Sequence, residues 1–337
     1  MKEARYYRQE AGQKVSCSLC PHNCLIAEGR NGLCQVRGNR GGKLYALTYG
    51  RVISAASDPI EKKPLYHYYP GAQTLSLGSV GCNLHCLHCQ NWQISQCSAA
   101  QGDASLQQLS PAEAIAETRA RGAEILVFTY NEPSLWFEYI LDCAELARAQ
   151  QIKLVLVTSG MINPKPLTEL LAVVDAYRVD IKGFSREFYR KLTGFDVLDQ
   201  VLANTSAAYQ AGVHVEVVTN LIPGWNDDDK QLRGLAGWLR DELTAEVPWH
   251  ITRYVPCHRL TVPATPLQSL ERGLQIGREE GLTHIYLGNV AAHATENTCC
   301  SGCGEILIAR RGFSTLENRL VAGRCPACQM ELGCYRG

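Results

Sequence analysis

Short apolar runs alternate with amphipathic stretches between residue 73 and residue 290. Runs such as TLSLGSVG, EILVFTY and IKLVLVTSG are apolar almost throughout, and each precedes a segment whose apolar residues recur with helical spacing. Strands that are apolar on both sides and separated by helices indicate a parallel sheet with both faces covered. The expected strands are 73–81, 124–130, 152–160, 175–183, 213–224, 249–255 and 284–290, and the expected helices are 111–122, 134–150, 164–174, 197–210, 228–241 and 267–280.

The fold class expected from this rhythm is α/β, with a partial (βα) barrel of about six units rather than a complete barrel of eight. Small cysteine-rich metal-binding modules are expected at both ends. The interpretation divides the chain into a cysteine-rich N-terminal module (1–63), the barrel (64–293) and a zinc-ribbon-like C-terminal module (294–337). In such a fold the chemistry lies at the C-terminal ends of the strands.

Composition and charge exclude several classes of protein. Apolar residues make up 46% and charged residues 20%, as in ordinary soluble domains. No apolar run approaches the roughly 20 residues of a membrane span, and the first residues lack the apolar centre of a signal peptide. Lys plus Arg and Asp plus Glu both number 33, which gives no support for a nucleic-acid partner. We therefore expect a cytoplasmic protein without membrane contact.

Cysteine carries most of the chemical information, because eleven of the 16 cysteines fall into three short-spaced groups. Without a secretion signal, such spacing indicates metal ligation rather than disulfides. The groups are an N-terminal quartet (Cys17, Cys20, Cys24, Cys34), a central triad (Cys82, Cys86, Cys89) and a C-terminal quartet (Cys300, Cys303, Cys325, Cys328).

The central triad has the spacing C-x3-C-x2-C, so its thiolates can reach three irons of one cubane. One iron is then left without a protein ligand, and such an open position lets a small molecule bind metal directly. The alternative is a zinc site completed by His85 or His88.

The two quartets suggest further metals. The C-terminal quartet forms two C-x2-C knuckles, which are typical of tetrahedral zinc or of a rubredoxin-like iron. Zinc is preferred, because no neighbouring feature requires redox activity. The N-terminal quartet could hold zinc, with His22 replacing one ligand, or a second iron–sulfur cluster that relays electrons. Spacing alone does not separate these metals.

The central spacing resembles the radical S-adenosylmethionine (SAM) superfamily, whose aromatic position before the third cysteine is held here by His88. The longer string SVGCNLHCLHCQNWQISQ, with TYNEP, DIKG, LIPGWND, WHITRY and YLGNV, is similar to the radical SAM enzyme of the AmmeMemoRadiSam system, a relative of the pyruvate formate-lyase activating enzymes. The resemblance includes both terminal cysteine modules and so covers nearly the whole chain.

This resemblance implies a [4Fe-4S] cluster on the central triad and SAM on its open iron. Reductive cleavage of SAM would give a 5'-deoxyadenosyl radical that abstracts hydrogen from an unidentified substrate. It also implies a low-potential electron donor such as flavodoxin or ferredoxin, and protein partners from the AmmeMemoRadiSam system.

The same resemblance implies which residues hold the cofactor. Glu132 stands where activating enzymes carry Gly-Gly-Glu and would accept the SAM ammonium, although an acid at a helix N-terminus is the alternative. Asp180 and Lys182 would lie near the carboxyl end of SAM or form a plain ion pair. His250 is either on the adenosyl or substrate side or a core histidine. The remaining expected cofactor residues are His88, Asn131, Thr158, Ser159, Asn220 and Asn289.

Two other functions stay open at this point. One is an activase that installs a glycyl radical on a partner enzyme. The other is a non-catalytic iron–sulfur and zinc scaffold or an electron-transfer module, against which the open iron and Glu132 argue. Cys257 follows a late strand at the barrel rim, where it is either a small buried hydrophobe or a thiol facing the substrate.

Overall fold

The computed structural model describes residues 1–291 and 293–337 and is built on one eight-stranded sheet. The strand order is β16-β15-β14-β13-β12-β11-β9-β8. Neighbours from β9 to β16 pair in parallel, and β8 pairs antiparallel with β9 at one edge. The strands are β8 (Ser54–Pro59), β9 (Gln73–Gly78), β11 (Ile125–Phe128), β12 (Lys153–Thr158), β13 (Ala176–Asp180), β14 (His214–Leu221), β15 (Trp249–Arg253) and β16 (Ile285–Gly288).

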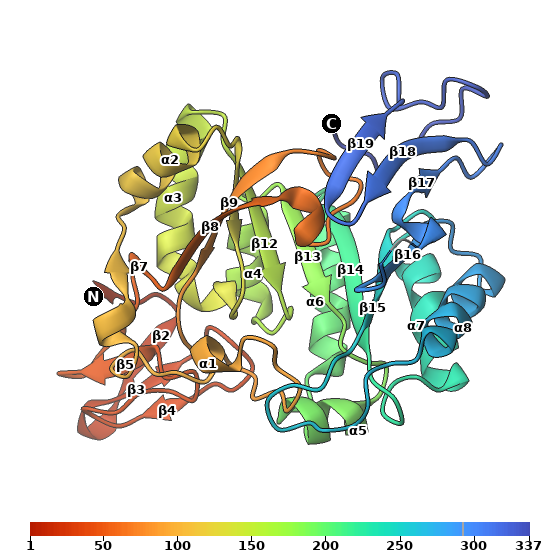
Figure 1. Cartoon of the computed structure of the whole chain (residues 1–337). Helices are drawn as coiled ribbons and strands as arrows, with labels where there is room; N and C mark the ends of the chain where they lie inside the picture. Colours follow the sequence, from red (N-terminus) through yellow and green to blue (C-terminus); the bar gives the residue numbers. More distant parts are fainter. Residues whose placement is uncertain (292) are drawn as a thin grey trace.

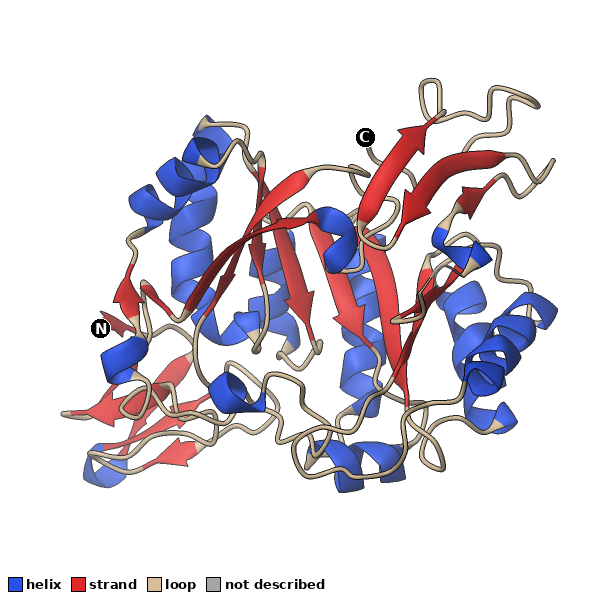
Figure 2. Cartoon of the chain, in the orientation of Figure 1, coloured by secondary structure: helices blue, strands red, loops and turns tan. Residues whose placement is uncertain are grey.

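Helices connect successive parallel strands and lie along one face of the sheet (Figures 1 and 2). They are α2 (Pro111–Ala120), α3 (Phe137–Ala149), α4 (Pro164–Leu171), α6 (Leu198–Gln210), α7 (Asp229–Glu242) and α8 (Leu267–Glu279). The expected βα alternation is confirmed. Within the described residues β16 and β8 are the two edges of the sheet, so it stays open and forms no closed barrel.

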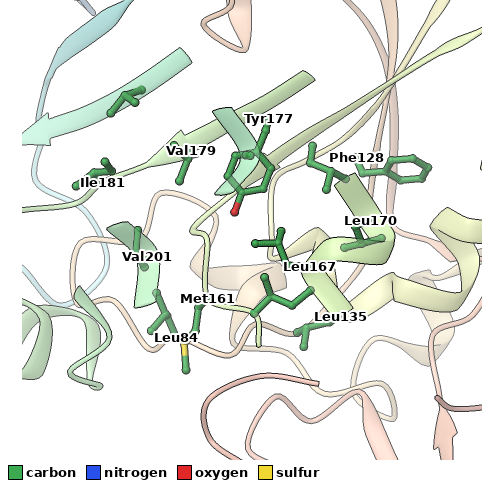
Figure 3. Close-up of a cluster of buried hydrophobic side chains, with 14 of the residues drawn as sticks. Leu84, Phe128, Leu135, Met161, Leu167, Leu170, Tyr177, Val179, Ile181 and Val201 are labelled. Carbon is green, nitrogen blue, oxygen red and sulfur yellow. The ribbon is translucent and has the colours of Figure 1, made fainter. Parts of the chain in front are cut away.

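Side chains from the sheet and the helices form the main core (Figure 3). Phe128 and Tyr177 from the sheet lie on the same side as Leu167 and Leu170 of α4. Leu84, which stands between the first two cysteines of the central triad, is 1% exposed and belongs to this core. Burying a leucine is worth about 2 kcal/mol, so the core fixes the cysteine loop in place.

The opposite face of the sheet is also covered. Ile60, Leu65 and Tyr68 pack against sheet residues that include Val127 and Val155. The segment from 60 to 69 thus lies over the middle strands. Both faces are buried, as the uninterrupted apolar runs of the strands predict.

Short strands make up the N-terminal module. Two three-stranded sheets have the orders β1-β6-β5 and β2-β3-β4, and β7 pairs with β10. Residues 43–54 contain β6, β7 and the start of β8, which joins the large sheet. The bounds are β1 (Lys2–Glu3), β2 (Tyr7–Glu10), β3 (Lys14–Cys17), β4 (Leu25–Ile26), β5 (Arg37–Arg40), β6 (Lys43–Ala46), β7 (Arg51–Val52) and β10 (Gln107–Gln108).

The C-terminal module is an antiparallel sheet of β17 (Thr298–Cys299), β18 (Ile306–Arg311) and β19 (Ser314–Asn318). It docks through the buried Arg310, whose guanidinium donates to the Tyr66 carbonyl at 2.6 Å and to Thr298 Oγ1 at 2.9 Å. No helix in residues 1–291 or 293–337 is long and apolar enough to cross a bilayer.

Candidate active site

The central triad lies on the loop that follows β9, at the edge where the parallel strands end. Figure 1 shows these strands pointing toward the end of the molecule that holds α1 (Trp92–Ser95) and α5 (Arg186–Phe188). The loop leaves β9 through Gly81, whose φ of +83° favours glycine. Its backbone is then held by hydrogen bonds from His85 N to the Thr193 carbonyl (2.9 Å) and from Leu87 N to the Leu192 carbonyl (2.8 Å).

The three sulfurs of the triad do not have the spacing of a single-ion site. Among the described residues only the C-terminal quartet brings three or more ligand atoms within 4.8 Å of one another. Cysteines that bind different irons of a cubane stand farther apart than ligands of one zinc ion. The triad geometry therefore fits a cluster better than a zinc ion completed by His85 or His88.

A cavity of about 200 Å³ opens in front of the triad. It is lined by all three cysteines and by polar residues from the ends of β11, β12, β13 and β14. The structure thus brings most of the expected cofactor residues to one place. Those lining the cavity are His88, Asn131, Glu132, Thr158, Ser159, Asp180, Lys182 and Asn220.

Glu132 is the centre of a hydrogen-bond network in this cavity. It is 2% exposed. One carboxylate oxygen accepts from Ser134 N (3.1 Å) and Thr158 Oγ1 (2.7 Å), and the other accepts from Ser159 N (2.9 Å) and Ser159 Oγ (2.7 Å). The bond to Ser134 N is also the helix-start contact expected of an acid at this position. Glu132 therefore joins the ends of β11 and β12.

Asn131 fixes the start of the cysteine loop. Its amide donates to the carbonyls of Val80 (3.2 Å) and Gly81 (2.8 Å) and accepts from Ser79 N (3.2 Å). The preceding Tyr130 has a φ of +78°, which is rare for a bulky residue and marks local strain. Asn131 thus contacts the protein backbone with both ends of its amide.

Charged residues at the end of β13 face the same cavity. Asp180 accepts from Arg178 at 2.6 Å and lies 3.6 Å from the Lys182 ammonium. Burial alone would lower the pKa of Lys182, but the Asp180 carboxylate and the nearby Cys86 raise it above its ordinary value. Burial raises the pKa of Asp180, and the two cations more than offset this and lower it. The group is therefore ionised at neutral pH and carries a net positive charge.

Two buried polar atoms in the cavity have no hydrogen-bond partner among the described residues: His88 Nδ1 and Asn220 Oδ1. Burial lowers the pKa of His88 to about 3, so its imidazole is neutral. Buried polar atoms without a partner are costly, and their presence beside three cysteines suits a site that binds a polar ligand.

Comparison with known proteins agrees with this geometry. The family model described as the radical SAM superfamily matches residues 77–236. This range includes the triad and every residue named so far in the cavity. The chain belongs to the radical SAM superfamily.

Its relatives among curated proteins fall into two groups. The chain is 40% identical over 331 residues to the uncharacterized protein MJ0808 of Methanocaldococcus jannaschii, a match covering 97% of this chain and 98% of that one. It is 24% identical over 181 residues to the pyruvate formate-lyase 1-activating enzyme of Escherichia coli strain K12, which covers 50% of this chain and 71% of the relative. The chain is therefore a radical SAM enzyme related to activating enzymes.

A solved structure shows the same fold. The radical SAM methyltransferase from Sphaerobacter thermophilus is 18% identical, covers 71% of each chain and aligns with a TM-score of 0.51. Membership of the superfamily implies a [4Fe-4S] cluster and SAM. The open triad, the cavity before it and the two unpartnered polar atoms fit these groups.

A second cavity of about 490 Å³ adjoins the first in this radical SAM enzyme. Gln90, Arg178, Asp180 and Asn220 line both cavities, so the two share a wall. Residues of the second cavity alone include Lys62, Tyr66, His250, Asn289 and Phe313. Phe313 belongs to the turn between β18 and β19, and the C-terminal module therefore forms part of this wall.

His250 lines this second cavity, and its ring is hydrogen-bonded to Glu216 of β14. Its Nε2 lies 2.6 Å from Glu216 Oε2, and the same carboxylate accepts from His214 Nε2 (3.0 Å) and from the backbone amides of Tyr66 and His67. His250 is 1% exposed. The other expected residue outside the first cavity, Asn289, donates to the Arg253 carbonyl at 3.1 Å and lines the second cavity.

The other cysteines have distinct settings. In the C-terminal quartet Cys300 Sγ and Cys328 Sγ are 3.5 Å apart, close to the separation of ~3.8 Å expected between sulfurs about 2.3 Å from one tetrahedral ion. Cys257 Sγ lies 3.5 Å from the Cys89 carbonyl, so its thiol contacts the backbone of the cysteine loop. Among the described residues it lines neither cavity.

Sequence reasoning missed Arg178, Gln90 and Glu216. Arg178 precedes Asp180 by two residues on one strand, so strand alternation places both on the same side and could have identified it. Glu216 is likewise a charged residue inside an apolar run, which demands a buried partner. Gln90 directly follows the third cysteine, and no sequence signal separates it from an ordinary loop residue.

Proposed function

We propose that this enzyme uses the SAM-derived radical to abstract hydrogen from a polar substrate held in the second cavity. The observation that carries the proposal is the wall that the two cavities share. One cavity contains the triad, and the other provides a separate polar compartment beside it. A radical formed in the first cavity would therefore lie next to a target held in the second.

The triad would hold the cluster, and the first cavity would hold SAM. When bound there, SAM supplies a 5'-deoxyadenosyl radical through one-electron cleavage of its sulfonium. Lys182 and Arg178 provide the positive charge that suits the SAM carboxylate. His88, Asn131 and Asn220 line the first cavity and belong to the proposed cofactor-binding set, whereas Asn289 lines the second cavity and would reach SAM only from that side.

Glu132 has a more restricted role in this scheme. A carboxylate has about four lone-pair sites, and protein donors occupy all four here. We therefore propose that it orients Thr158 and Ser159 toward the cofactor and attracts the SAM ammonium mainly by its charge.

The second cavity indicates the class of substrate. Lys62 and Arg178 offer cations, Asp180 and Glu296 offer carboxylates, and Asn220 offers an unpartnered amide oxygen. Such mixed lining favours a small molecule or side chain with both charged and hydrogen-bonding groups.

The narrower assignment to the AmmeMemoRadiSam system is also a proposal. It is supported by the motifs of the sequence and by a relative that matches the chain from end to end. We propose that the proteins of this system supply the substrate and that a flavodoxin or ferredoxin supplies electrons. We further propose zinc for the C-terminal quartet, because its sulfur spacing suits a tetrahedral ion.

A second candidate is a glycyl-radical activase. It is favoured by the similarity to activating enzymes, including the isethionate sulfite-lyase activating enzyme of Desulfovibrio desulfuricans, 23% identical over 188 residues. The chain covers 56% of that relative and 71% of the pyruvate formate-lyase 1-activating enzyme. The substrate would then be a glycine in a partner protein.

One labelling experiment separates the two candidates. The reconstituted enzyme is incubated under anaerobic conditions with reductant, SAM and a deuterated cell extract that has been divided by ultrafiltration. Deuterium in 5'-deoxyadenosine after incubation with the small-molecule filtrate supports the first proposal. Deuterium only after incubation with the retained macromolecules contradicts it and supports the activase, and the undeuterated extract is the control.

A further inference from the structure

The N-terminal quartet converges on a cavity of its own, distinct from the two cavities described above. Cys17, Cys20, Cys24 and Cys34 all line this small space. Leu19, Ile26 and Leu135 complete its walls with apolar side chains. Cys17, Cys20 and Cys34 are each no more than 8% exposed. Four thiols thus surround one largely apolar chamber.

The spacing of these sulfurs differs from that of the C-terminal quartet. Among the described residues no three of the N-terminal sulfurs lie within 4.8 Å of one another, whereas all four of the C-terminal sulfurs do. One zinc ion draws its four sulfurs together, so the N-terminal arrangement is too wide for it. A four-iron cubane takes one cysteine at each iron and therefore needs the wider arrangement.

A buried cation lies against the same chamber. Arg37 is 1% exposed and lines the cavity. Its terminal nitrogens bind Glu138 at 2.8 and 3.0 Å, but its Nε has no hydrogen-bond partner among the described residues. A buried N–H without an acceptor is rare. A sulfide or cysteinyl sulfur of a cluster would provide that acceptor.

One small residue keeps the wall of the chamber open. Gly32 lines it, and a Cβ on Gly32 would come within 3.2 Å of Ile26 Cδ1 and 3.6 Å of Cys24 Sγ. His22 completes the wall, but its Nε2 is already engaged with the Asn83 carbonyl at 2.8 Å. Four cysteines are therefore the natural ligand set.

The quartet adjoins the central triad through the residues on either side of Cys82. The Asn83 carbonyl lies 2.8 Å from His22 Nε2, and the Asn83 side chain lies near the Cys20 thiol. On the other side, a Cβ on Gly81 would lie 2.6 Å from the Cys34 carbonyl. The two neighbours of Cys82 in the chain, Gly81 and Asn83, therefore approach Cys34 and Cys20 closely.

We propose that the N-terminal quartet binds a second [4Fe-4S] cluster, which passes electrons to the cluster on the central triad through the Gly81–Asn83 segment. A low-potential flavodoxin- or ferredoxin-type donor gives one electron to the N-terminal cluster. That cluster is reoxidised when the electron moves to the central cluster, and the electron is finally consumed in breaking one carbon–sulfur bond of SAM. One donor is oxidised for each SAM cleaved.

Metal analysis tests the site itself. The protein is reconstituted anaerobically as the parent, as the Cys17→Ala, Cys34→Ala double variant, and as Cys299→Ser, which alters a cysteine outside all three groups. We expect about eight irons per chain in the parent and in Cys299→Ser, and about four in the double variant. Zinc should stay unchanged in all three. Loss of zinc with full retention of iron in the double variant would overturn the proposal.

A second, milder variant keeps the test valid if the double variant fails to fold. Cys24 is the most exposed member of the quartet, and Cys24→Ser keeps the size of the side chain. The electron paramagnetic resonance spectrum of the reduced protein should change from that of two interacting clusters in the parent to that of a single cluster in this variant. A parent protein with a single-cluster signal would contradict the proposal, whatever the state of the variants.

The relay is tested by comparing two reductants. Dithionite is small and can reach the central cluster directly, so the double variant should be reduced by it as fully as the parent. Reduction of the central cluster by a flavodoxin should be at least ~10-fold slower in the double variant. The rate is measured from the growth of the electron paramagnetic resonance signal of the reduced central cluster. Equal rates with flavodoxin would reject the relay while leaving the second cluster in place.

Discussion

Glu132 connects two strand ends through four hydrogen bonds, and this makes it sensitive to a change of one atom. In Glu132→Gln an amide NH2 replaces an acceptor and faces donors from either Thr158 or Ser159. Two bonds to a charged group are lost, so we expect a loss of ~2–3 kcal/mol in stability and at least ~10-fold weaker SAM binding. Thermal unfolding and equilibrium dialysis with labelled SAM measure these effects.

The matched control for that variant is Glu187→Gln, a carboxylate on the surface whose partner is Lys191. It should change neither stability nor SAM affinity noticeably, because exposed ion pairs contribute little. Normal SAM binding by Glu132→Gln would show that the Thr158–Ser159 turn does not serve the cofactor.

Glu216 and His250 predict how stability depends on pH. Burial alone would raise the pKa of Glu216, but hydrogen bonds from His214 and His250 hold it well below its ordinary value. Burial lowers the pKa of His250, and Glu216 offsets this only in part. Both groups bind protons less readily folded than unfolded. The contribution of His250 to stability is therefore present at neutral pH and is lost as the pH falls below about 6.5, whereas the contribution of Glu216 is lost only below about pH 4.5.

The test is His250→Gln, whose amide can still donate to Glu216. Melting temperatures of parent and variant are compared at neutral and at mildly acidic pH. We expect the parent to lose at least ~2 °C more than the variant on acidification. His214, His67 and Tyr286 also face this cluster, so some dependence on pH should remain in the variant. An equal loss in both proteins would contradict the assignment.

The sequence predicts which residues gather at the site better than it predicts the contacts that they make there. Those carried by family motifs, such as Glu132 and Asp180, do meet in one cavity. The sequence could not show that Glu132 is saturated by protein donors or that His250 is bound by Glu216, because both facts depend on contacts between separate strands. Arg178 was within reach of simple strand alternation.

At the scale of elements, the hydrophobic pattern of the sequence predicts the strands of the large sheet well and the strands of the N-terminal cysteine module poorly. All seven expected parallel strands are present, because long apolar runs and helical periodicity act over many residues. In the N-terminal module several strands contain only two residues, such as Lys2–Glu3 and Leu25–Ile26. Runs of that length carry no periodic signal.

The structure of the C-terminal module should depend on the metal that its four cysteines bind. Cys325 is fully buried at its centre beside Leu307 and Ile308. In Cys325→Ser we expect loss of one zinc per chain and of the local structure, with the iron content retained. Cys299→Ser, one residue from the quartet, should keep its zinc. Metal analysis and limited proteolysis check both, and a Cys325→Ser protein with full zinc would contradict the four-cysteine site.

At the scale of the molecule, the two terminal modules flank the large sheet, and both contact the region around the central triad. The C-terminal hairpin reaches the second cavity through Phe313, and the N-terminal module reaches the cysteine loop through His22. Figure 1 shows the two modules at opposite corners of the sheet. The chain therefore places both a four-cysteine chamber and a polar compartment next to the site of the triad.

The most direct test of the account is the yield of 5'-deoxyadenosine and methionine from the reconstituted enzyme with SAM and a strong reductant. The parent and the control Cys97→Ala, which alters a cysteine outside the three groups, should form both products. Cys86→Ala should form neither while keeping the secondary structure of the parent, because the core residue Leu84 still fixes the loop. Product formation by Cys86→Ala at the parent's rate would contradict the assignment of the central triad.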